Sequence, residues 1–195
     1  MSTAKEASKE QSPKNGTAAA RLISEALTQA AIPHAVVGGL AVFANVWEAR
    51  NEIAHTRNDV DLLLNRDDIG KAKTIIGGLG YKFELLSKLL RNRMPNHWHY
   101  VRAIVAGEKF APSSFDEAPA LSEVTTFRSV LGFQCLRAAP LLQMKLSAYR
   151  HIDKVDVQDM LDAKLITPKV ARSLPGDLCL RLQHMKEVTK EERRR

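Results

Sequence analysis

Two acidic residues stand two positions apart at the start of an apolar stretch, Asp59-Val60-Asp61 followed by three leucines. On a β-strand, side chains two positions apart point to the same face, with Cα atoms about 6.5 Å apart. Two carboxylates held in this way repel each other, and a divalent cation relieves the repulsion. Oxygen ligands suit Mg²⁺, which completes its shell with water and phosphate oxygens. Asp59 and Asp61 are therefore candidate ligands of Mg²⁺ or Mn²⁺, although a solvated strand end carries the same pattern.

A pair of glycines, Gly38-Gly39, separates the short apolar run 34–37 from a longer one, residues 40–47. Glycines at the start of a helix let bare backbone N–H groups approach a phosphate closely. Alone, such a pair is usually just a turn. Together with the two aspartates twenty residues later, it predicts a site for a metal-bound nucleoside triphosphate.

These residues need helices and strands to position them, and the apolar spacing predicts both. Helical spacing and caps predict helices over residues 17–31, 40–47, about 67–78, 140–149, 155–165 and 178–188. Strand patterns lie at residues 34–37, 59–64, 80–84 and 99–105, with a hairpin of 125–130 and 133–136 after a loop over 111–123. This order predicts an α/β (α+β) fold, in which helices flank a short mixed sheet and the C-terminal part is helical.

The runs VVGGLAVFANVW and HTRNDVDLLL resemble the signature of the DNA polymerase beta-like nucleotidyltransferase superfamily. The likeness is greatest to its small bacterial branch of abortive-infection and toxin–antitoxin nucleotidyltransferases. A second likeness spans 139–160, where the family has a lysine on one helix and an Arg/Lys–Asp–x–x–Asp segment at the start of the next. The resemblance therefore covers about residues 20–166, and it implies the nucleotidyltransferase fold.

The resemblance also implies an activity, the transfer of a nucleoside monophosphate from a triphosphate to a macromolecular acceptor such as tRNA or a protein. It suggests a role in toxin–antitoxin or phage defence, with a cognate antitoxin as partner and Mg²⁺ or Mn²⁺ as cofactor. The catalytic residues that it implies are Asp59, Asp61, Lys145 and Asp156, with Asp159 beside the last. The nucleotide-binding residues that it implies are Gly38, Gly39, Thr56, Arg57 and Lys145.

Three of these residues have other interpretations. Lys145 has apolar neighbours on its predicted helix, so its side chain either extends to water or reaches an anion in a cleft. Asp156 and Asp159 share one helix face, where they either serve the site or simply favour the helix dipole.

One position departs from the family pattern. Catalytic members carry a third acid on a later strand, but the matching strand here, residues 99–105, has no carboxylate and places Arg102 at that position. Glu84 and Glu108 are nearby acids, yet neither sits in the matching place. An arginine favours an anion but does not deprotonate a hydroxyl. The alternative function is therefore a catalytically impaired nucleotidyltransferase-fold protein that binds a nucleotide or a partner protein.

Two weaker features concern other ligands. His97 and His99 form a candidate zinc pair, or contribute to the cleft, but no further ligand stands nearby. A basic group could meet a nucleic acid or simply be solvated: Arg50, His55, Arg57, Arg91 and Arg93. A basic RNA- or DNA-binding module without a metal is thus a third hypothesis.

Composition sets the outer bounds. The 195 residues carry a net charge of +7 and are 45% hydrophobic, which suits a globular domain with an anionic partner. No apolar run approaches membrane length, and no secretory signal opens the chain, so we expect a cytoplasmic protein. Cys135 and Cys179, both among apolar neighbours, are predicted to be buried reduced thiols. We expect a disordered tail over 1–16, a nucleotidyltransferase core over 17–137, a helical part over 138–190 and a second tail over 191–195.

Overall fold

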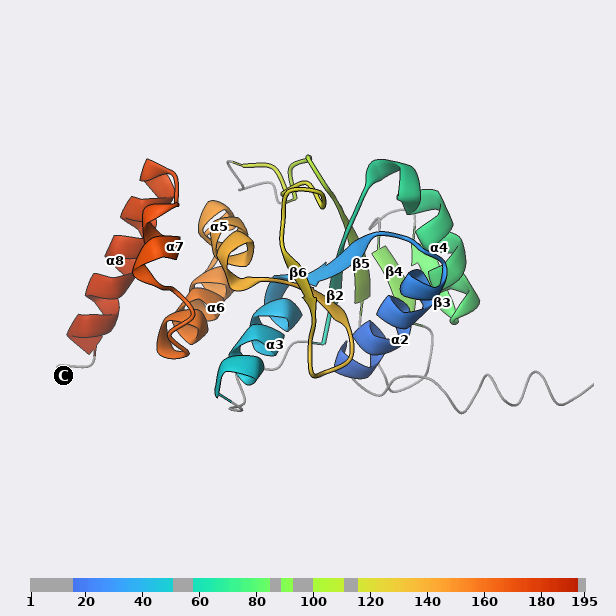
Figure 1. Cartoon of the computed structure of the whole chain (residues 1–195), viewed down its shortest axis with the longest axis horizontal. Helices are drawn as coiled ribbons and strands as arrows, with labels where there is room; N and C mark the ends of the chain where they lie inside the picture. The colour runs from blue at the N-terminus through green and yellow to red at the C-terminus, as the bar shows by residue number, and fades with distance from the viewer. Residues whose placement is uncertain (1–15, 51–57, 85–88, 93–99, 111–115, 193–195) are drawn as a thin grey trace, which may run out of the picture.

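The computed structural model describes residues 16–50, 58–84, 89–92, 100–110 and 116–192 (Figure 1). Its strands are β1 (His34–Val37), β2 (Val60–Leu64), β3 (Tyr81–Glu84), β4 (Leu89–Asn92), β5 (Tyr100–Val105), β6 (Thr126–Arg128) and β7 (Gln134–Leu136). Its α-helices are α2 (Gly16–Gln29), α3 (Gly38–Arg50), α4 (Ile69–Gly78), α5 (Ala138–Ala148), α6 (His151–Asp162), α7 (Pro168–Arg172) and α8 (Gly176–Glu192). A 3₁₀ turn, Arg66–Asp68, precedes α4.

In the described part of the chain, the strands form one mixed sheet in the order β3-β4-β5-β2-β1-β7-β6. The central strand β2 is antiparallel to β1 and parallel to β5. The register places Val37 opposite Asp61, and Asp61 opposite Arg102. Residues opposite one another in a sheet point to the same face. The register therefore brings the side chains of Asp61 and Arg102 together on one face of the sheet, beside the end of β1 that leads into α3.

Helices close both ends of the molecule around this sheet. Figure 1 shows α5 to α8 gathered at one end, α2 and α4 at the other, and the sheet between them. All four residues of β1 are buried, and the three leucines that end β2 are almost completely buried. Burying apolar side chains is the main favourable term in folding, so this core fixes the middle strands firmly. Asp61, near the start of β2, and Asp59, just before it, are thus carried by a rigid strand.

The predicted fold class is confirmed, and most predicted elements are present. The hairpin forms as β6 and β7, with Gly132 in the left-handed region at its turn. Two elements were not expected: strand β4 and the short helix α7. Helix α6 begins at His151 rather than near 155. Asp153 therefore occupies its first turn, the position that favours the dipole, whereas Asp156 lies one turn further on.

The cysteine prediction holds in part. Both cysteines are free thiols, and Cys135 is buried in strand β7, where burial raises the pKa of its thiol. Cys179 is only half-buried on α8, so its predicted burial is wrong. Among the described residues, no helix is both long enough and apolar enough to span a bilayer.

Candidate functional site

The candidate site begins where β1 passes directly into α3 at Gly38. Gly38 has a φ of +69°, and a Cβ atom added there would lie 2.3 Å from Oδ2 of Asp61. Only glycine combines this backbone conformation with so close an approach. The start of α3, where the first N–H groups have no partner inside the helix, therefore lies against the Asp61 carboxylate.

Arg102 holds the same carboxylate from the neighbouring strand. Its Nε donates to Oδ1 of Asp61 at 2.8 Å, and its Nη2 donates to Oδ2 at 2.9 Å. The Asp61 side chain is only 13% exposed, and that of Arg102 is 41% exposed. Two parallel hydrogen bonds of this kind are the strongest geometry between arginine and a carboxylate. These hydrogen bonds raise the pKa of Arg102 above its ordinary value.

Asp59 lies just before β2 and is exposed. Its Oδ1 accepts a hydrogen bond from the backbone N–H of Tyr100 at 3.2 Å. This contact ties Asp59 to the start of β5, on the strand that carries Arg102.

The opposite wall comes from the junction of α5 and α6. Arg150 is the N-cap of α6, and its backbone N–H donates to Oδ2 of Asp153 at 3.1 Å. Nε of Arg150 donates to Oδ2 of Asp153 at 2.7 Å. Lys145 on α5 lies 3.1 Å from Oδ1 of Asp153 and 2.7 Å from Oδ2 of Asp156. The Lys145 side chain, 9% exposed, thus reaches anions rather than water, and these anions are carboxylates of the protein itself.

The charges on this wall shift two pKa values. Burial alone would raise the pKa of Asp153, but the hydrogen bond from Arg150 and the charge of Lys145 outweigh it and leave the pKa below its ordinary value. The hydrogen bond to Asp153 raises the pKa of Arg150. Both groups therefore remain charged at neutral pH.

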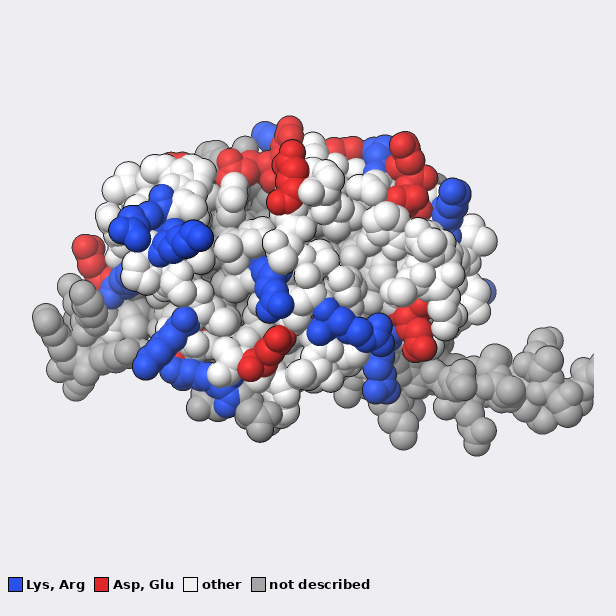
Figure 2. Space-filling model, viewed as in Figure 1, with Lys and Arg blue, Asp and Glu red and all other residues white. Residues whose placement is uncertain are grey.

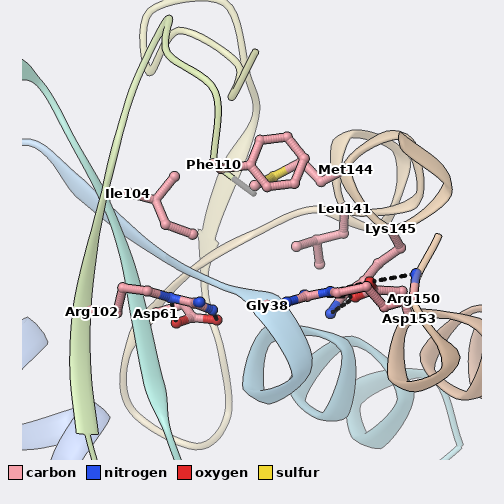
Figure 3. Close-up of a pocket in the computed structure, with 10 residues that line it drawn as sticks. All are labelled: Gly38, Asp61, Arg102, Ile104, Phe110, Leu141, Met144, Lys145, Arg150 and Asp153. Atoms are coloured by element: carbon pink, nitrogen blue, oxygen red, sulfur yellow. Dashed lines mark hydrogen bonds and ion pairs between the residues drawn. The ribbon is translucent and has the colours of Figure 1, made fainter. Parts of the chain in front are cut away.

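These two walls enclose a cavity, drawn in Figure 3. Its polar lining is Gly38, Asp61, Arg102, Lys145, Arg150 and Asp153, and its apolar lining is Ile104, Phe110, Leu141 and Met144. The guanidinium groups of Arg102 and Arg150 point toward one another from opposite sides, near the start of α3. The space left between the side chains is about 20 Å³, which accommodates roughly one water molecule. A phosphate group is larger than this space, so the lining side chains would have to shift to admit one.

The predicted site residues are thus brought together only in part. Gly38, Asp61 and Lys145 line the cavity, whereas Gly39, Asp59, Asp156 and Asp159 are not part of its lining. Thr56 and Arg57 lie outside the described residues, as do His97 and His99.

Neither of the two alternative acids lies on a strand next to β2. Glu108 is exposed beyond the far end of β5, where it pairs with Arg66. Glu84 ends β3, which is separated from β2 by two other strands in the sheet.

The arrangement of these side chains does not fit a divalent metal ion. Both oxygens of Asp61 accept hydrogen bonds from Arg102, and one of them also packs against Gly38. Among the described residues, no group of three or more His, Cys, Asp or Glu is placed to hold a metal. Binding by Mg²⁺ at Asp59 and Asp61 would require Arg102 to leave the site.

The basic cluster falls mostly outside the described residues, which include the side chain of Arg50 but not those of its other members. On the face drawn in Figure 2, Lys and Arg lie in separate small groups, and several acidic side chains gather along the upper edge. A broad basic surface would be the electrostatic footprint of a nucleic-acid interface. The visible side of the described chain does not present one.

Two cavity residues, Arg150 and Asp153, were not singled out from the sequence. Asp153 could have been noticed as an acid in the first turn of a helix, where it favours the dipole, but the predicted helix began four residues too late. No local pattern singles out Arg150.

Solved structures supply the comparison with known proteins. An antigenic nucleotidyltransferase-like protein from Paracoccidioides brasiliensis is 13% identical, with a TM-score of 0.58 over 92% of this chain and 91% of that one. A lincosamide antibiotic adenylyltransferase with lincomycin bound is also 13% identical, with a TM-score of 0.50 over 75% of this chain and 94% of its own. No protein-family model and no curated protein matches the sequence. At these identities the likeness establishes the nucleotidyltransferase fold and nothing further.

Proposed function

We propose that this nucleotidyltransferase-fold protein binds the phosphate groups of a nucleoside triphosphate and does not carry out metal-dependent nucleotidyl transfer. The observation that carries the proposal is the pair of hydrogen bonds from Arg102 to Asp61. The carboxylate that a transferase of this fold would use for its metal is neutralised by an arginine of the protein itself.

Binding of an anion is supported by the two arginines that face the cavity. Arg102 and Arg150 reach it from opposite walls, whereas the charge of Lys145 is balanced by Asp156 behind the lining. Arginine side chains recognise phosphate with two hydrogen bonds at a time, and the N–H groups at the start of α3 favour negative charge. The apolar lining offers a surface for the less polar part of a nucleotide.

Calorimetric titration with each of the four ribonucleoside triphosphates tests the binding. We expect Arg150→Ala to weaken binding by about 10- to 100-fold, the loss of a hydrogen bond to a charged group. Arg128→Ala is the matched control, since Arg128 is exposed on the edge strand β6. Binding that is absent in the wild type, or unchanged in Arg150→Ala, contradicts the proposal.

The prediction of transfer to tRNA or a protein needs a separate experiment. Labelled triphosphates incubated with cell extract should leave no labelled acceptor above the level of an Asp61→Asn variant. Labelling by the wild type that Asp61→Asn abolishes would show an active transferase, and a toxin–antitoxin role would then regain its basis.

A further inference from the structure

The Asp61 carboxylate is enclosed on both sides by the protein. Gly38 packs against Oδ2 on one side, and the Arg102 guanidinium spans both oxygens on the other. Neither contact depends on a flexible loop, because Asp61 and Arg102 face each other in the paired strands β2 and β5. The pair is therefore built into the sheet register.

Arg102 also lies in the field of two further carboxylates. Asp59 and Asp153 are the two other carboxylates whose charges act on Arg102. Asp59 comes from the same strand end as Asp61, whereas Asp153 comes from α6 on the opposite wall. Asp153 is already paired with Lys145 and Arg150, so Asp61 and Asp59 are the carboxylates beside which Arg102 stands where a divalent ion would have oxygen ligands.

We propose that Arg102 is a built-in cation that takes the place of a divalent metal ion beside Asp59 and Asp61, so that the site receives the metal-free form of a phosphate-bearing ligand. The first half of this statement rests on the protein alone. The second half rests on the proposed function.

The charges explain why the metal-free ligand is preferred. Arg102 uses one edge of its guanidinium for Asp61, and its remaining N–H groups are available to a phosphate in the cavity. Arg150 reaches toward the same space from the other wall. A triphosphate without Mg²⁺ carries more negative charge than its magnesium complex. The Mg²⁺ of that complex would also be repelled by both arginines.

Titration with Mn²⁺, followed by its paramagnetic resonance signal, tests the built-in cation without any nucleotide. We expect no specific binding to the wild type. Arg102→Asp should bind Mn²⁺ at least about tenfold more tightly than any weak binding left in the wild type, a change equivalent to about 1.4 kcal/mol. Arg66→Asp, which makes the same charge change at the surface pair with Glu108, should behave as the wild type.

Arg102→Asn is a second variant that frees Asp61 without adding a carboxylate, in case Arg102→Asp does not fold. Folding of either variant is checked by circular dichroism. Mn²⁺ binding by the wild type that Asp61→Asn abolishes would overturn the proposal. A folded Arg102→Asp protein that binds Mn²⁺ no better than Arg66→Asp would overturn it as well.

Titration with ATP, as the probe nucleotide, in EDTA and in excess Mg²⁺ tests the ligand form. We expect the wild type to bind at least about tenfold more tightly in EDTA. Tighter binding in Mg²⁺ would overturn this inference while leaving triphosphate binding in place. Absence of any triphosphate binding in both solutions would instead defeat the proposed function, and the Mn²⁺ titration would still decide the role of Arg102.

Discussion

Gly38 and Asp61 are in closer contact than any side chain at position 38 would allow. The glycine adopts a left-handed conformation, and its Cα faces the Asp61 carboxylate with no room for a methyl group. This contact sets where the carboxylate lies, and the carboxylate in turn orients Arg102. A single backbone position therefore determines the geometry of the charged pair on which the proposed site depends.

Gly38→Ala should lower the free energy of unfolding by at least about 1–2 kcal/mol, because an alanine is strained in the left-handed region. It should also displace Asp61 and weaken ligand binding. Urea denaturation measures the first effect and calorimetric titration the second.

Gly70→Ala is the matched control for Gly38→Ala. Gly70 lies in α4, and nothing stands within 4 Å of its added Cβ, so the variant should be as stable as the wild type or slightly more so. A Gly38→Ala protein as stable as Gly70→Ala would contradict the close packing described above.

The junction of α5 and α6 is held by buried charge rather than by apolar contact alone. Helix α5 ends at Ala148, its C-cap Tyr149 has the left-handed conformation, and α6 begins at His151. Asp153, only 1% exposed, accepts from both Lys145 and Arg150 and so links the end of one helix to the start of the next. The second wall of the cavity depends on this link.

Asp153→Asn should lower the free energy of unfolding by about 1.5–3 kcal/mol, because Lys145 and Arg150 lose a charged hydrogen-bond partner while Lys145 keeps Asp156. Chemical denaturation measures the loss. Glu108→Gln, which breaks the exposed pair with Arg66, should have a much smaller effect. Equal losses in the two variants would mean that the buried pairs do not stabilise the junction.

For the whole molecule, the free energy of unfolding depends on pH through a histidine buried in the core. His34 starts the buried strand β1, with its ring nitrogens 2.8 Å from Oγ of Ser24 and from the carbonyl oxygen of Ile32. Burial lowers the pKa of His34, although the hydrogen bond to Ile32 opposes the shift. The unfolded chain therefore takes up a proton at a higher pH than the folded protein does.

The free energy of unfolding should accordingly fall as the pH drops below about 6.5, the ordinary pKa of histidine. The depressed pKa of Asp153 adds a further loss in more acidic solution, as that carboxylate becomes protonated. Melting temperatures across this range measure the slope. His34→Gln should flatten the part that begins near pH 6.5, and His184→Gln, altered at an exposed position on α8, should not.

Structural features that depend on residues close together in the chain could be predicted from the sequence. Short apolar runs and strand patterns predicted β1, β2, β3, β5 and the hairpin, because burial follows the local pattern of apolar residues. The types and spacing of the residues placed Gly38 and Asp61 in one site, but they did not predict the direct contact between the two. Strand β4 was missed, because its pattern, LLRN, is short and has no clear alternation.

Only the tertiary structure decided which charged side chains pair with one another. Arg102 and Asp61 are 41 residues apart, and their pairing depends on the register of two parallel strands, which no local pattern encodes. Lys145 likewise faces Asp153 and Asp156 only because two helices pack together. The sequence thus determined that two carboxylates would stand at the start of a buried strand. The fold determined that Asp61 is paired with an arginine of the protein itself, because long-range packing sets which charges meet.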